Sequence, residues 1–138
     1  DLISNNRQAG EDWLIKIGNE LPDTLVRDRI IEYAGLVNET SIQAIVNQYG
    51  NSGYVVESVP LALFGVAKSW EIGFEASMNE IIQSGGDADT NASMMGQVAG
   101  SELGIKKLPI SMLKQIELLP EYVEIKSIIT DWKKINWT

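Results

Sequence analysis

The chain has 138 residues, 44% hydrophobic and 22% charged, which is enough to bury one hydrophobic core. Its formal net charge of -8 argues against nucleic acid as a partner, because phosphate backbones are bound by clustered Lys and Arg. The sequence has no Cys and no His, which excludes thiolate nucleophiles, His general bases and ordinary zinc sites, so any metal must be held by oxygen ligands.

Helical spacing of hydrophobic residues dominates the chain from end to end. The predicted helices follow one another at residues 13–21, 25–33, 41–48, 58–67, 72–83, 90–103, 109–118 and 120–134. Pro22 and Pro60 are expected in the first turns of the second and fourth helices, and Thr40 or Ser41 is expected to cap the third. We therefore predict an all-α fold and a single domain over residues 1–138.

Three glycines recur at every fourth position in the helix predicted at residues 90–103 and just after it: Gly96, Gly100 and Gly104. Glycine inside a helix costs about 0.8 to 1 kcal/mol relative to Ala, so this stripe predicts close approach of a neighbouring helix and a central place in the fold. Trp132 and Trp137 are expected to anchor the last helix by packing.

The longest apolar stretch, residues 59–67, is much shorter than the roughly 20 residues of a membrane-spanning helix, so we expect no membrane contact. The absence of Cys fits a reducing compartment, and a cytoplasmic location is expected. The chain begins at Asp1 without a leader, which is typical of an internal or processed piece of a longer protein.

The sharpest chemical feature is the glycine-led turn that contains Asp87, Asp89 and Thr90. Two carboxylates separated by one residue can converge on one cation, and Thr90 adds a hydroxyl oxygen. A simpler explanation is that Asp89 or Thr90 caps a helix. The spacing excludes an EF-hand, because Ala92 and Val98 stand where that loop requires Gly and Glu.

The segment from Gly85 to Ala92, which reads Gly-Gly-Asp-Ala-Asp-Thr-Asn-Ala, resembles the carboxyl-terminal signature of the ADP-ribosylglycohydrolase family. Upstream, residues 50–64 resemble that family's glycine-containing loop and the Ser-Val-Pro helix after it. Downstream, residues 104–109 resemble its usual exit from the signature helix. The matches follow one another in the family's order, and they identify the chain as the carboxyl-terminal half of such a protein.

The resemblance implies a compact multi-helix fold and magnesium-dependent hydrolysis of the bond between ADP-ribose and an acceptor such as Arg or Ser. It implies two Mg²⁺ ions in the complete site, or Mn²⁺ in some members, with Asp87, Asp89 and Thr90 among the ligands. The loop of Asn51, Ser52, Gly53 and Tyr54 should then border the ADP-ribose, although it could also be an ordinary connection between helices.

The chain departs from the family in ways that limit this prediction. Family members are roughly twice as long, and their amino-terminal half carries a Thr-Asp-Asp-Thr-like motif that supplies the other metal ligands. No two aspartates are adjacent in this sequence, and no residue matches the family's general base, so the catalytic residue is unknown. Glu57 is interpreted as a solvated carboxylate at a helix start in preference to an orienting residue.

These departures lead to an expectation about partners and to one alternative function. The expected partners are ADP-ribose or an ADP-ribosylated protein, together with the missing amino-terminal half or a second copy of the chain, because helices meant to pack against that half would expose an apolar face. The alternative is a non-catalytic binding or structural descendant of the fold, like the crystallin-type relatives of the family.

Overall fold

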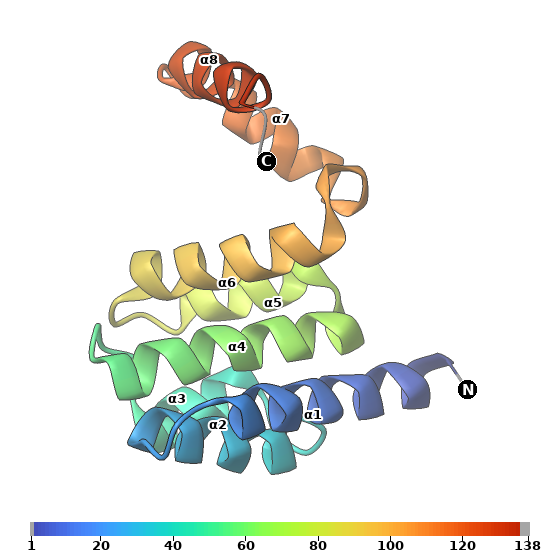
Figure 1. The fold of residues 1–138 in the computed structure, drawn as a ribbon, viewed down its shortest axis with the longest axis vertical. Helices are drawn as coiled ribbons and strands as arrows, with labels where there is room; N and C mark the ends of the chain where they lie inside the picture. Colours follow the sequence, from blue (N-terminus) through green and yellow to red (C-terminus); the bar gives the residue numbers. More distant parts are fainter. Residues whose placement is uncertain (1, 136–138) are drawn as a thin grey trace. The chain divides into compact units, whose positions relative to one another are not determined.

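The computed structural model describes the backbone of residues 2–135 and the side chains of residues 9–135, and within these residues it is helical throughout, without strands (Figure 1). The α-helices are α1 Leu2–Glu20, α2 Leu25–Leu36, α3 Ile42–Tyr49, α4 Val55–Ile72, α5 Phe74–Gln83, α6 Ala88–Leu103, α7 Ile110–Glu117 and α8 Tyr122–Trp132. A short 3₁₀ helix, η1, covers Ile105–Lys107. The prediction of an all-α fold is confirmed.

The chain divides into two compact units, Asp1–Ile105 and Lys106–Thr138. The first unit is built around α4, which packs against α1, α2, α3, α5 and α6 (Figure 1). The sequence of α4 is largely apolar, and in the structure its Phe64 and Val66 are fully buried and Ala67 is nearly so. The glycine stripe predicted a central α6, which is wrong: among the described helices, α4 is the central one, and the main neighbours of α6 are α4 and α5.

Of the three glycines in the predicted stripe, Gly96 has the expected close neighbour, and Gly100 and Gly104 do not. A side chain at Gly96 would meet Met78 at 3.3 Å, whereas nothing lies within 4 Å of one at Gly100. Gly104 adopts a positive φ of 67° and ends the helix. The close approach between helices occurs instead at Gly65 of α4, where an added Cβ would lie 3.1 Å from the sulfur of Met95 in α6.

Helix boundaries differ from the prediction at both prolines. The second helix begins at Leu25, because the Thr24 hydroxyl accepts a hydrogen bond from the backbone N–H of Arg27, so Pro22 precedes the helix. Pro60 lies inside α4, which starts five residues earlier at Val55. Ser41 caps α3 through a bond from the Ala44 N–H, as predicted.

Aromatic side chains, among them Trp13 and Trp70, tie the helices of the first unit together. Their rings, from α1 and α4, meet edge to face with centroids 5.3 Å apart. Tyr33 of α2 meets Phe64 of α4 in the same way at 5.5 Å, and both side chains are fully buried. Such pairs add about 0.5–1.5 kcal/mol beyond the burial of their area.

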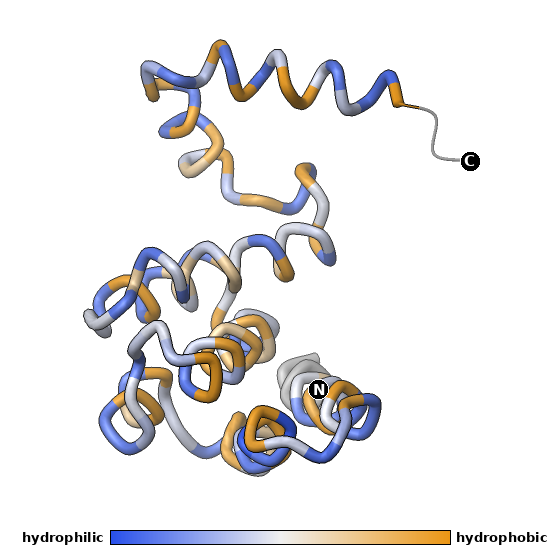
Figure 2. Tube along the Cα trace, turned by 60° about the vertical axis from the view of Figure 1, so that its left-hand side comes forward, coloured by the Kyte–Doolittle hydropathy of each residue, from blue (hydrophilic) through white to orange (hydrophobic). Residues whose placement is uncertain are grey.

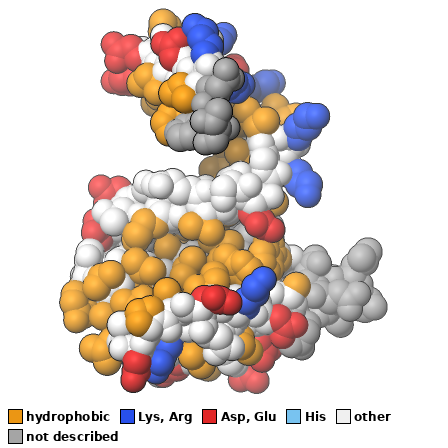
Figure 3. Space-filling model, viewed as in Figure 1, with side chains coloured by type: hydrophobic (Ala, Val, Ile, Leu, Met, Phe, Trp, Pro, Cys, Tyr) orange, Lys and Arg blue, Asp and Glu red, His pale blue; other side chains and the backbone are white. Residues whose placement is uncertain are grey.

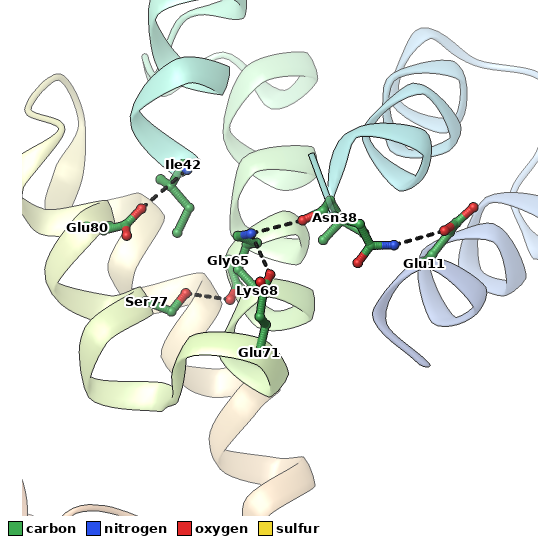
Figure 4. A network of polar contacts seen from close by, with 9 residues as sticks. Glu11, Asn38, Ile42, Gly65, Lys68, Glu71, Ser77 and Glu80 are labelled. Carbon is green, nitrogen blue, oxygen red and sulfur yellow. Dashed lines mark hydrogen bonds and ion pairs between the residues drawn. The ribbon is translucent and has the colours of Figure 1, made fainter. Parts of the chain in front are cut away.

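A buried polar network lies near the carboxyl end of α4 (Figure 4). The Lys68 ammonium donates to the Val37 carbonyl at 3.0 Å and to a Glu71 carboxylate oxygen at 2.7 Å. On α5, the Glu80 carboxylate accepts from the Ile42 N–H at 3.3 Å, at the start of α3. The network therefore attaches the segment between α2 and α3 to the helices α4 and α5.

The second unit has a different character from the first. Figure 2 shows hydrophobic and hydrophilic residues alternating along α8, yet none of the described residues 106–135 is buried. Val123 and Ile128 are 76% and 66% exposed, and Trp132, the expected anchor, is 59% exposed. Trp137 lies outside the described residues. Within the described part of the chain, no helix combines the length and the hydropathy needed to cross a bilayer.

Candidate functional site

The predicted metal residues lie in the turn that joins α5 to α6. Gly85 and Gly86 adopt positive φ angles of 74° and 63° and reverse the chain direction. Asp87 occupies the N-cap position of α6, but its carboxylate makes no capping hydrogen bond. The alternative prediction placed the cap at Asp89 or Thr90, whereas both residues are inside the first turn of α6.

The carboxyls of Asp87 and Asp89 lie close to each other at this helix start. A hydrogen bond from the backbone N–H of Thr90, followed by contact with the Asp87 carboxyl, lowers the pKa of Asp89 below its ordinary value. Asp89 and Thr90 are exposed, and Asp87 is half-buried. The partial positive charge of the helix start attracts acidic side chains to this position.

The Asn51–Tyr54 loop, predicted to bind the substrate, lies directly against this turn. The Asn51 amide nitrogen donates to the carbonyls of Ser84 and Gly85, at 3.0 and 2.8 Å. The Asn51 carbonyl accepts from the backbone N–H of Asp87 at 3.0 Å. The structure therefore brings together the two segments that the sequence identified 35 residues apart, and Asn51 joins them.

Gly53 is a further point of close approach between the two segments. A Cβ added at this position would lie 2.5 Å from a carboxylate oxygen of Asp87, so any larger residue would displace that carboxylate. Next to it, Tyr54 precedes α4, and its side chain is 57% exposed. Tyr54 is therefore an exposed member of the loop that lies against the turn.

Glu57 corrects one interpretation drawn from the sequence. Its carboxylate accepts hydrogen bonds from the Ser52 N–H at 2.9 Å and from the Ser52 hydroxyl at 2.7 Å. These bonds lower the pKa of Glu57. Glu57 is therefore an organiser of the loop, and the available signal was its place as third residue of a helix, from which an acidic side chain reaches back to the preceding backbone.

The turn offers an incomplete set of ligands for a divalent cation. Two carboxylates and one hydroxyl provide suitable oxygens, but magnesium prefers six. Among the described residues, no group of three or more acidic side chains is placed to hold a metal. A pocket of about 290 Å³ lies elsewhere, beside Lys68 and Glu80 at the other end of α4. The turn therefore supplies three oxygen-bearing side chains but no complete metal site.

Comparison with known proteins identifies the family. The family model for ADP-ribosylglycohydrolase matches residues 4–134. A curated relative, ADP-ribosylhydrolase ARH3 of Danio rerio, is 34% identical over 80 residues, which cover 51% of this chain and 22% of that protein. An uncharacterized protein of Archaeoglobus fulgidus is 29% identical over 103 residues, 74% of this chain and 33% of that protein.

The matched part of the chain thus spans between about a fifth and a third of these curated relatives. No solved structure matches the chain significantly. The family match extends over almost all of the sequence and includes both the Asn51 loop and the Asp87 turn. The chain belongs to the ADP-ribosylglycohydrolase family.

Proposed function

We propose that the chain contributes to magnesium-dependent hydrolysis of the glycosidic bond between ADP-ribose and a modified acceptor. Asp87, Asp89 and Thr90 would supply part of a site for two Mg²⁺ ions, or Mn²⁺, and the Asn51–Tyr54 loop would form one wall of the substrate pocket. The observation that carries this proposal is the place of the Asp87 carboxylate, which makes no capping bond at the helix start and lies beside that of Asp89.

Each residue of this surface has a physical task in the proposed reaction. The ionised carboxylates would hold the cation, which when bound supplies a Lewis acid that orients ribose hydroxyls and polarises water. Tyr54 would offer its exposed ring or hydroxyl to the ligand. Ser52 and Asn51 support the loop, because their side chains already bond to Glu57 and to the turn.

The remaining ligands would come from a complementary part of the family's domain. Figure 3 shows hydrophobic side chains gathered on one face of the first unit, over the strip where α4 lies in Figure 1. Exposed apolar area of this kind favours association with another polypeptide. That partner would be the amino-terminal half typical of the family, and a second copy of the chain is the competing occupant.

The test measures release of ADP-ribose from an ADP-ribosylated Arg or Ser peptide. The chain is assayed alone and mixed with the amino-terminal half of a family member, with and without Mg²⁺. We expect release only in the mixture with Mg²⁺, and loss of release in the variant with Asp87→Ala and Asp89→Ala. Glu75→Ala, which removes an exposed carboxylate from the first turn of α5, is the matched control and should retain activity.

Two results would contradict this proposal. Activity that survives the double substitution would remove the metal role of the turn. A folded mixture that binds ADP-ribose but never releases it from the peptide would favour the non-catalytic, crystallin-type alternative.

A further inference from the structure

Asn51 joins the Asn51–Tyr54 loop to the Asp87 turn through a set of hydrogen bonds, which we call the Asn51–Asn91 clamp. Its side-chain nitrogen donates to the carbonyls of Ser84 and Gly85, and its carbonyl accepts from the Asp87 N–H. The same carbonyl accepts a second bond, at 3.0 Å, from the side-chain nitrogen of Asn91. One residue of the loop is therefore fixed to backbone groups on both sides of the two glycines of the turn.

Asn91 has features that helix packing alone does not explain. It belongs to α6, its side chain is fully buried, and its side-chain oxygen has no hydrogen-bond partner. A buried acceptor without a partner is destabilising, and an apolar residue of similar size would avoid the loss. The Asn91 amide donates the hydrogen bond to the Asn51 carbonyl, and this bond fixes the loop relative to the first turns of α6.

The surrounding geometry leaves the two segments little freedom to move separately. A Cβ at Gly86 would overlap the side chain of Asn51, so the turn and the Asn51 amide are in direct contact there. At Gly53 the backbone lies against the Asp87 carboxylate. A displacement of that carboxylate, such as metal binding would produce, is therefore transmitted to the loop through contacts on both sides.

We propose that the Asn51–Asn91 clamp couples cation binding at the Asp87 turn to the conformation of the Asn51–Tyr54 loop, so that both asparagines are positioning residues for metal and ligand. This inference rests on the proposed metal role of the turn. Because coupling between two sites is reciprocal, a ligand that orders the loop would also strengthen cation binding. Loss of such supporting contacts lowers metal affinity by about tenfold or more.

The test follows backbone amide signals of the whole chain by NMR during a titration with MgCl₂. In the wild type, the amides of Asp89 and Thr90 report the cation, and those of Ser52 and Gly53 report the loop. We expect both sets to shift with one shared midpoint. In Asn91→Leu, we expect the Asp89 and Thr90 signals to respond with a midpoint about tenfold higher and the loop signals to lose their response.

The controls separate positioning from folding. Gln97→Ala removes an exposed amide of the same helix, one that donates to the Ser93 hydroxyl, and should preserve the shared midpoint. Asn91→Ala, a smaller substitution, is measured beside Asn91→Leu, and thermal unfolding of each variant is followed by circular dichroism. If both Asn91 variants are unfolded, the residue serves the fold and the inference is overturned.

The remaining outcomes distinguish this inference from the proposed function. If MgCl₂ shifts neither set of wild-type signals, the metal role of the turn fails, and the coupling fails with it. If the cation shifts the Asp89 and Thr90 signals but the Ser52 and Gly53 signals respond equally in wild type and folded Asn91 variants, the metal role stands and the clamp does not couple the segments.

Discussion

The two ends of α4 carry polar clusters that differ in one decisive respect. At the carboxyl end, Lys68 is buried and its ammonium is bonded to Val37 and Glu71. At the amino end, the polar backbone of the loop and turn is bonded, but the carboxylates of Asp87 and Asp89 lie beside each other at the surface. The first cluster stabilises the fold, and the second includes the two carboxylates that are proposed to bind a cation.

The comparison also shows why a pocket alone is a poor guide in this protein. The pocket of about 290 Å³ lies beside Lys68, where the polar groups around it already bond within the first unit. This pocket is not lined by the Asp87 turn, which carries the oxygen-bearing side chains that are proposed to hold a cation. The proposed cation site needs no enclosed pocket within this chain alone, because a partner would supply its other side.

The largest expected effect concerns the Lys68 end. Lys68→Met removes the ammonium while keeping most of the side-chain volume, and it removes the donor to the Val37 carbonyl and breaks the ion pair between Lys68 and Glu71. Breaking a buried ion pair costs about 3 kcal/mol or more. Denaturant unfolding should show this loss, whereas Lys16→Met at an exposed position of α1 should change stability little.

Lys68→Met also tests whether the two ends of α4 have separate roles. In the fraction of Lys68→Met that remains folded, Mg²⁺ binding at the Asp87 turn should be unchanged. A large loss of Mg²⁺ affinity in folded Lys68→Met would mean that the two ends of α4 do not have separate roles.

The next largest effect concerns Gly53. In Gly53→Ala, the added Cβ would lie 2.5 Å from an Asp87 carboxylate oxygen and displace it, and we expect Mg²⁺ affinity to fall by about tenfold. Stability should change little, because Gly53 is not among the glycines with positive φ. Calorimetric titration with MgCl₂ measures the affinity.

Gly35→Ala is the matched control for this substitution, since nothing lies within 4 Å of a Cβ at that position. We expect it to stabilise α2 by up to about 1 kcal/mol and to leave Mg²⁺ affinity unaltered. Equal Mg²⁺ affinities in the two variants would show that the Asp87 carboxylate is not positioned by its contact with Gly53.

The smallest effect is a dependence on pH. The bonds from Ser52 lower the folded pKa of Glu57 below its ordinary value of 4.5, so its stabilisation of the loop is complete above 4.5 and is lost as the pH falls through the folded pKa. The NMR shift of the Ser52 amide should be constant from neutral pH to about 4.5 and change only below that value.

In Glu57→Gln this acid transition should disappear, while global stability changes by about 0.5 kcal/mol or less because the side chain is only half-buried. A Ser52 transition that persists in the variant would assign the bond to another acid.

The helical architecture could be predicted because hydrophobic spacing and caps act locally. Ser41 was one of two residues predicted to cap the start of the third helix, and it does so because its hydroxyl accepts a hydrogen bond within its own turn. The centre of the fold could not be predicted this way. The stripe at Gly96 and Gly100 pointed to α6, yet only the tertiary arrangement decides whether a glycine faces a neighbour, as Gly65 does, or open space, as Gly100 does.

The candidate site shows the same division between local and distant signals. The residue types and spacing of Asp87, Asp89 and Thr90 singled out this turn as the candidate site. The structure adds that the Asp87 side chain makes no capping hydrogen bond. The partners of Asn51 lie at least 33 residues away, so no local pattern could reveal the clamp. The part played by Glu57 was missed because its bonds run backwards into the loop.

The most direct test of the account is a calorimetric titration of the chain with MgCl₂ at millimolar concentration. The wild type should bind weakly and saturably, Glu75→Gln should bind equally well, and the variant with Asp87→Asn and Asp89→Asn should not bind while remaining folded. Unchanged binding by that double variant, or an absence of binding by the wild type, would contradict the assignment of this turn as one side of a metal site.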